Sequence, residues 1–200
     1  MQNPFAQIEH DPAIVFALNR ELRIIYCNAA WDRFAQLNGG GLLQRPRPYG
    51  LCVLDVVPEC LRDLYDPAYR GVFTTGRQWI LEYECSSAVV YRWFRMTVIK
   101  RPEDDFILSV NFLLEERPHG EERQIAIPDS VVYGAPGNAA VMCSFCRRTR
   151  RSDGRGWDWV PAYVKNPPTP VVQGICEGCQ GKLYLPHCRT APASPCRKQS

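Results

Sequence analysis

The sequence predicts an α+β fold, in which a five-stranded antiparallel sheet carries short helices on one face and precedes a small cysteine-rich domain. Two strand-length apolar runs come first, helix signals follow, and three more strand-like runs begin after Gly76. In these last runs apolar residues alternate with polar ones, which is typical of strands with one buried face. Four cysteines in two close pairs follow residue 140 and predict the second domain.

The first elements are two strands and a capped helix. Residues 13–18 and 22–27 are β-rich runs separated by a short polar turn, which predicts a hairpin. Asn28 then occupies an N-cap position before residues 29–35, where apolar side chains recur at helical spacing.

Residues 38–76 predict a loop and two short helices. Glycines after Asn38 and a proline-rich stretch at 45–48 exclude a sheet strand. We expect a helix at 59–65, and Asp66-Pro67 predicts the start of a second helix that ends before Gly76.

Three alternating strands complete the first domain, at residues 79–85, 90–99 and 106–114. Phe94 and Met96 share one face of the middle strand, whereas Tyr91 and Trp93 share the other. An antiparallel sheet of five strands buries one face against the helices and makes a domain of about one hundred residues.

Residues 11–116 resemble a PAS domain, the sensory module of many signalling proteins. The order of elements fits, and the segment I-Y-C-N-A-A-W-D-R-F at 25–34 is similar to the N-x-A-x-x-x-F region of that family. Gly76 before the third strand and residues 83–86 also fit. The resemblance implies that this domain senses a small ligand or a partner protein, and the ligand is unknown.

Cys143 and Cys146 form one C-x-x-C pair, and Cys176 and Cys179 form another. This spacing lets both sulfurs of a pair turn toward one ion, and two pairs surround a tetrahedral zinc at about 2.3 Å per Zn–S bond. The 29 residues between the pairs predict an elaborated insert in a zinc-ribbon-like domain at 136–186. A redox dithiol or iron–sulfur use, and cysteines that merely pack, are the alternatives.

The cysteine-rich text also resembles an extension that follows PAS modules in many bacterial signalling proteins. In that extension Ser-His-Gly often introduces the second cysteine pair, whereas Val172-Gln173-Gly174 stands here. The missing histidine leaves a four-thiolate site intact but weakens any chemical role for that position. Residues 117–135 are charged and predict a linker, and residues 187–200 predict a disordered basic tail.

Two groups of residues are candidate contact sites. The formal net charge is +3, but residues 141–200 contain ten Lys and Arg against three Asp and Glu. The candidate contacts to nucleic acid or an acidic partner are Arg147, Arg148, Arg150 and Arg151. The alternative is a solvated loop whose charge offsets a zinc–thiolate centre.

Tyr91 and Trp93 are a candidate interface with a second protomer, the cysteine domain or another protein, and packing against the chain's own linker is the alternative.

The sequence disfavours membrane-spanning and secreted proteins, and two kinds of cofactor. No apolar run reaches 18 residues, and residues 1–20 lack a leader pattern, so we expect reduced thiols, a cytoplasmic location and no membrane contact. We expect no haem, because His10, His119 and His187 lie outside the predicted helix at 67–75, and no photochemical flavin. The remaining cysteines in the first domain are expected to be small buried residues: Cys27, Cys52, Cys60 and Cys85.

The sequence therefore predicts a non-catalytic sensor or adaptor in bacterial signal transduction. A phosphate-binding glycine loop, a nucleophile elbow and a histidine paired with a nucleophile are all missing, and four cysteines leave a zinc ion without an open position. The partners expected are a signalling protein or a second copy through the PAS-like sheet. A nucleic-acid-binding regulator and a thiol redox switch are the alternatives.

Overall fold

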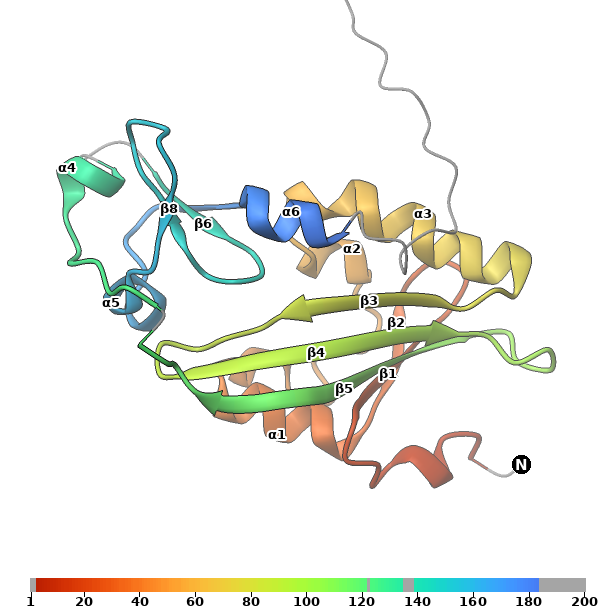
Figure 1. Ribbon diagram of the computed structural model, residues 1–200. Coiled ribbons are helices and arrows are strands. Elements are labelled where there is room, and N and C mark those ends of the chain that lie inside the picture. Colours follow the sequence, from red (N-terminus) through yellow and green to blue (C-terminus); the bar gives the residue numbers. More distant parts are fainter. Residues whose placement is uncertain (1–2, 122, 135–138, 184–200) are drawn as a thin grey trace, which may run out of the picture.

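A computed structural model describes residues 3–121, 123–134 and 139–183, which form two sheets with helices around them (Figure 1). The elements of the PAS-like domain are η1 (Ala6–Ile8), β1 (Ile14–Leu18), β2 (Ile24–Cys27), α1 (Ala29–Leu37), η2 (Gly41–Leu43), α2 (Val53–Val56), α3 (Glu59–Thr75), β3 (Trp79–Glu84), β4 (Val90–Ile99) and β5 (Ile107–Pro118). Those of the cysteine-rich extension, as we call residues 139–183, are β6 (Ala140–Cys143), β7 (Thr149–Arg150), β8 (Trp157–Asp158), α5 (Pro161–Lys165), β9 (Val171–Gly174) and α6 (Glu177–Leu183). A short helix, α4 (Ser130–Tyr133), precedes the extension.

The first sheet has five antiparallel strands, as the sequence predicts, and the structure gives their order as β2-β1-β5-β4-β3. β1 and β2 form the expected hairpin, and β4 pairs with β5 over its whole length, from Val90 opposite Pro118 to Ile99 opposite Leu108. Phe34 of α1 meets Phe94 edge-on, and Tyr69 of α3 meets Trp79 in the same way. Since Phe94 and Trp79 lie on the inner face, α1 and α3 cover the same face of the sheet.

Asn28 joins the hairpin to α1. Its side-chain oxygen accepts hydrogen bonds from the backbone N–H groups of Trp31 and Val15, both at 3.1 Å, and its amide donates to the Ala13 carbonyl at 2.9 Å. The residue is fully buried. The predicted N-cap is therefore confirmed, and the same side chain also holds the first strand in place.

The prediction of two short helices at 59–73 is wrong, because α3 is one continuous helix that contains Pro67. Proline removes one backbone hydrogen bond from the helix interior. Tyr69 and Val72, which follow it, are 1% exposed, so their burial against the sheet stabilises the helix through this position. Gly76 ends α3 with a φ of 67°, a conformation that favours glycine.

The second sheet has the order β8-β7-β6-β9. β6 pairs with β9 in parallel, from Ala140 opposite Val171 to Cys143 opposite Gly174, whereas the other pairings are antiparallel. β6 leads directly into the first cysteine pair and ends at Cys143. The insert between the cysteine pairs contributes β7, β8, α5 and β9.

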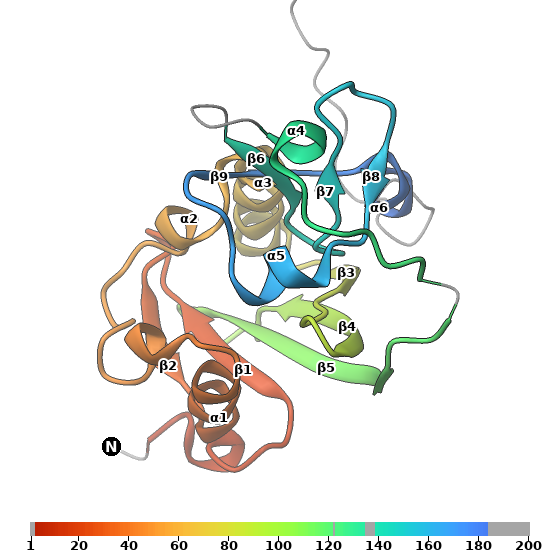
Figure 2. The ribbon, with the colours of Figure 1, turned by 90° about the vertical axis from the view of Figure 1, so that its left-hand side faces the viewer.

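The two sheets share one hydrophobic cluster. Leu81 and Met96 of the inner sheet face belong to the same buried cluster as Cys143, Phe145 and Leu183 of the extension. Figures 1 and 2 show the extension beside α3 and β3, with α6 running along β3. The domain boundaries inferred from the sequence stay a prediction, although β5 continues to Pro118 and so enters the predicted linker at 117–135. The predicted tail at 187–200 lies outside the described residues.

The helices described by the structure include none that is long and apolar enough to cross a membrane.

Candidate metal centre

The first cysteine pair lies on a tight turn at the end of β6. The Cys143 N–H donates to the Arg148 carbonyl at 2.8 Å, and the Arg147 N–H donates to the Cys143 carbonyl at 3.1 Å. Arg147 closes the turn with a φ of 62°, which is unusual for a residue other than glycine. This turn directs both sulfurs of the pair toward the same point.

The second pair follows β9, with Cys179 in the first turn of α6. Because β6 and β9 are parallel, their ends meet, and the Ser144 N–H donates to the Gly174 carbonyl at 2.8 Å. A Cβ atom at Gly174 would lie 3.0 Å from Val141 Cγ1 and 3.4 Å from the Trp157 ring. A side chain at residue 174 would therefore have to displace Val141 beside the metal centre.

The four sulfur atoms lie within 4.8 Å of one another, and all four cysteines are buried and free. Cys146 Sγ and Cys176 Sγ are 3.6 Å apart, which excludes a disulfide between them, since that bond is about 2.05 Å long. Sulfurs around a tetrahedral zinc are separated by about 3.8 Å. The structure thus brings together all four residues predicted as metal ligands, in an arrangement that suits a soft metal ion.

The four thiols of the cluster have different pKa shifts, and the thiolate form is favoured most at Cys143. Hydrogen bonds from Cys146, then from Cys176 and Cys179, hold the pKa of Cys143 well below its usual value, while burial acts in the opposite direction. The backbone N–H of Cys176 also donates to Cys143 Sγ at 3.5 Å. Hydrogen bonds with the Cys143 sulfur, above all, raise the pKa of Cys146. One thiolate is therefore stabilised by the other thiols, whereas four thiolates require a cation.

The predicted basic contact residues differ in their surroundings. Arg151 pairs with Asp158 at 3.1 Å and with Asp153 at 3.5 Å, so part of its charge is already neutralised. Within the described part of the chain, no ion pair is found for Arg147, Arg148 or Arg150, and Arg150 is exposed.

Tyr91 and Trp93, the predicted interface pair, have partners inside the chain. The guanidinium of Arg117 lies 4.5 Å from the centre of the Tyr91 ring. The ammonium of Lys182, on α6, lies 4.6 Å from the centre of the Trp93 ring. Of the alternatives weighed from the sequence, the geometry matches contact with the chain's own linker and with the cysteine domain.

A buried ion pair between Glu84 and Arg123 was not found from the sequence. The Arg123 and Glu84 side chains are only 9% and 6% exposed, and Ser86 Oγ donates to Glu84 at 2.6 Å. The Arg123 guanidinium also lies 4.5 Å from the ring centre of Trp159, just before α5. Arg123 thereby ties the predicted linker to β3 and to the extension. It stands among other charged residues, and nothing in the local pattern distinguishes it from them.

Four further cysteines in the described part of the chain, all in the PAS-like domain, are outside the four-thiol cluster. Cys27 is buried, and burial raises the pKa of its thiol to about 12. Cys52 and Cys85 are partly buried. The predicted burial of Cys60 is wrong, because this residue is exposed at the start of α3, where its sulfur lies 3.5 Å from Ser144 Oγ.

A five-stranded antiparallel sheet with helices on one face shares its core with a buried four-thiol cluster, which defines an α+β domain with a cysteine-rich extension. The sequence pattern described as the PAS fold matches residues 8–107, and the chain belongs to this family. The resemblance inferred from the sequence is therefore confirmed.

Two of the solved structures that are similar to this chain illustrate the likeness. One is a Vibrio cholerae VqmA dimer in the absence of its target DNA, a LuxR-type receptor, with 13% identity and a TM-score of 0.42 over 57% of this chain. The chain spans about half of the VqmA chain, 52% of its length. The other is a PAS domain from a two-component sensor histidine kinase, with 15% identity and a TM-score of 0.35, covering 56% of this chain and 90% of that one. Among curated proteins, no sequence matches.

Proposed function

We propose that this protein is a non-catalytic sensor or adaptor in bacterial signal transduction. The PAS domain receives a signal by binding a ligand or a partner, and the cysteine-rich extension, stabilised by a bound zinc ion, passes the signal on by protein contact. The protein acts in the cytoplasm. The observation that carries this proposal is the single hydrophobic cluster in which the buried thiols of Cys143, Cys146, Cys176 and Cys179 pack with the inner face of the PAS sheet.

Zinc is the proposed ion because four thiolates complete its tetrahedral shell and the ion itself has no redox chemistry. Elemental analysis of the purified protein is expected to find one zinc per chain, and Cys176→Ser is expected to remove it. Cys60→Ser is the matched control, because Cys60 is exposed and outside the cluster, and it should retain zinc. Iron in place of zinc, or zinc retained in Cys176→Ser, would refute the assignment.

The absence of catalysis is proposed from the lack of enzyme motifs and from the closed set of four ligands. Incubation with labelled ATP, followed by assays of hydrolysis and of phosphate on the protein, is expected to give no signal above a heat-denatured sample. Turnover or autophosphorylation would overturn the proposal.

A second copy or a signalling protein is the proposed partner of the PAS sheet. Phe112 lies opposite Arg95 on the outer face of the sheet and is 46% exposed, and the next residues, Leu113 and Leu114, are 47% and 45% exposed. Apolar side chains of this size on a sheet suit a protein contact. Native mass spectrometry of the wild-type chain and of Phe112→Ser measures whether this face holds a dimer together.

Nucleic acid is a second candidate partner, through Arg147, Arg148 and Arg150, for which no ion pair is found in the described part of the chain. Binding through arginines to phosphates weakens steeply as salt is added. An affinity for DNA or RNA that is insensitive to salt would count against this use of the arginines.

A redox switch is the remaining candidate, in which the pairs Cys143–Cys146 and Cys176–Cys179 oxidise and release the ion, and all four sulfurs lie within 4.8 Å of one another. Peroxide is then expected to consume thiols and release zinc together. Unchanged zinc content after peroxide treatment would eliminate this candidate.

A further inference from the structure

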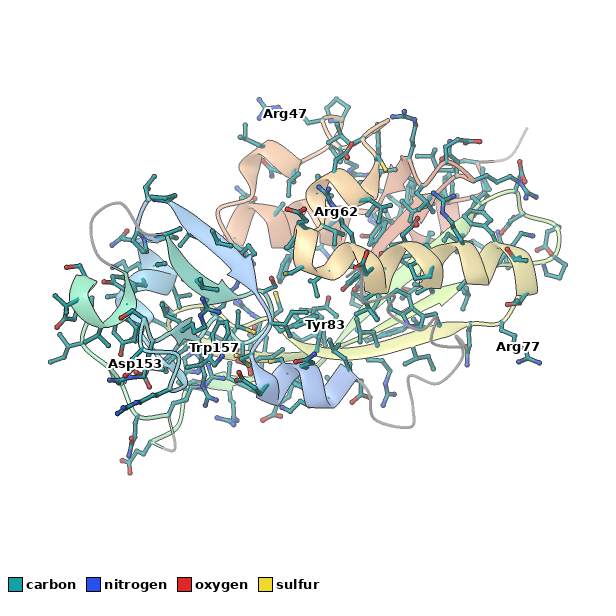
Figure 3. All side chains as sticks on the ribbon, turned by 90° about the horizontal axis from the view of Figure 1, so that it is seen from above. Arg47, Arg62, Arg77, Tyr83, Asp153 and Trp157 are labelled. Carbon is teal, nitrogen blue, oxygen red and sulfur yellow. The ribbon has the colours of Figure 1, made fainter. Side chains whose placement is uncertain are left out.

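Tyr83 of β3 lies where the metal centre meets the PAS sheet (Figure 3). Phe145 belongs to the turn that carries Cys143 and Cys146, and its ring centre is 6.0 Å from that of Tyr83. Cys179 and Leu183 of α6 line the same small hollow as Tyr83 and Phe145. Both cysteine pairs therefore approach Tyr83, one through a neighbouring side chain and the other through α6.

The other side of Tyr83 reaches into the PAS domain. Its hydroxyl donates to Asn111 Oδ1 at 3.0 Å, and the Asn111 amide donates to the Ile14 carbonyl on β1 at 3.2 Å. The Tyr83 ring also stacks on Phe94, with centres 5.8 Å apart, and Phe94 meets Phe34 of α1 at 5.7 Å. One side chain thus touches the first cysteine turn and is linked to β1, β4, β5 and α1.

The Tyr83–Asn111 hydrogen bond is costly to lose. Burial, and then the nearby Tyr65 and Cys85, raise the pKa of Tyr83 well above its usual value, so the hydroxyl remains a donor at neutral pH. Asn111 is 7% exposed, and its oxygen would lack this donor if Tyr83 moved away. A buried polar group that loses its hydrogen-bond partner destabilises the fold. A displacement of Tyr83 would therefore destabilise the structure around Asn111.

Phe145 stands between the two cysteines of the first pair. Phe145 lies in a turn of four residues whose two cysteines would both be bound to the metal, and metal binding orders such small elements. Without the ion, the Ser144–Gly174 hydrogen bond and the pairing of β6 with β9 still join the two segments, but the four sulfurs lose their common ligand. The surface that covers Tyr83 would then loosen.

We propose that Tyr83 couples the metal centre to the interior of the PAS domain. Loading of the four-thiol site orders β5 around Asn111, and a change at the Tyr83–Asn111 contact alters the affinity for the ion, because such coupling is reciprocal. This inference rests on the proposed zinc site, and it adds a route by which metal occupancy is itself an input to the PAS domain.

Hydrogen–deuterium exchange of the full chain tests the proposal, with zinc content measured on each sample. In the wild-type chain, chelation is expected to speed exchange at least about fivefold in peptides that cover residues 107–113. Tyr83→Phe should still bind one zinc but lose this response at β5. Tyr65→Phe is the matched control, because Tyr65 contacts Tyr69 and Trp79 rather than Phe145, and it should respond as the wild type does.

Zinc affinity provides a second measurement that does not depend on exchange. Competition with a chromophoric chelator is expected to show zinc binding weakened at least about fivefold in Tyr83→Phe and unchanged in Tyr65→Phe. A wild-type chain that binds one zinc, yet shows identical exchange at residues 107–113 with and without it, would overturn the coupling and leave the zinc site standing. A chain that binds no zinc would overturn both.

Discussion

The buried pair of Glu84 and Arg123 permits a sharp test of how the linker is held. Arg123→Met removes the charge but keeps much of the length of the side chain, and it leaves the Glu84 carboxylate almost fully buried without its partner. Removing one member of a buried pair typically costs 3–5 kcal/mol. Loss of the guanidinium from the face of Trp159 adds about 0.5–1 kcal/mol. We therefore expect the free energy of unfolding to fall by about 4 kcal/mol.

Urea unfolding followed by tryptophan fluorescence and circular dichroism measures this loss. The double variant Glu84→Gln with Arg123→Met should recover most of the stability, because neither side chain is then charged. Arg95→Met is the control, because Arg95 pairs with Glu82 at exposed positions, where side-chain exposures are 49% and 39%. Its expected cost is below about 1 kcal/mol. If Arg123→Met costs no more than Arg95→Met, the argument that Arg123 anchors the linker is refuted.

Three further predictions concern the metal centre. Cys176→Ser should unfold the region after residue 135 and leave the PAS sheet folded, and loss of both parts in a single transition seen by circular dichroism would show that they form one unit. Arg147→Gly should stabilise the extension by about 1 kcal/mol in thermal unfolding, because it relieves a φ of 62°, whereas Arg150→Gly, in a strand, should give no gain. Gly174→Ala should destabilise the extension by about 1–3 kcal/mol, because its Cβ meets another side chain at 3.0 Å. Gly178→Ala has open space and should cause no loss, and equal effects of the two alanines would contradict this packing argument.

Patterns within short segments predicted much of the fold. Asn28 before an apolar helical repeat predicted a capped helix, and alternation predicted that Phe94 and Met96 share one face of β4, which the structure shows to be the buried face. Such signals depend on neighbouring residues, and the structure confirms them. The same local reasoning wrongly divided α3 at Pro67 and wrongly predicted that Cys60 is buried. Both errors arise because the burial of a helix face depends on the residues that pack against it, and these are distant in the chain.

The sequence by itself determined the strands of the PAS sheet, the capped helix after Asn28 and the identity of the four clustered thiols, since strand alternation, capping and C-x-x-C spacing are all local properties. Only the tertiary structure decided that β6 and β9 are parallel, that the extension shares the core of the PAS domain, and that Tyr83 and Arg123 lie between the two. Each of these depends on contacts between residues that are distant in the chain. Such contacts follow from shape and burial in the folded protein, and they leave no periodic trace in the sequence.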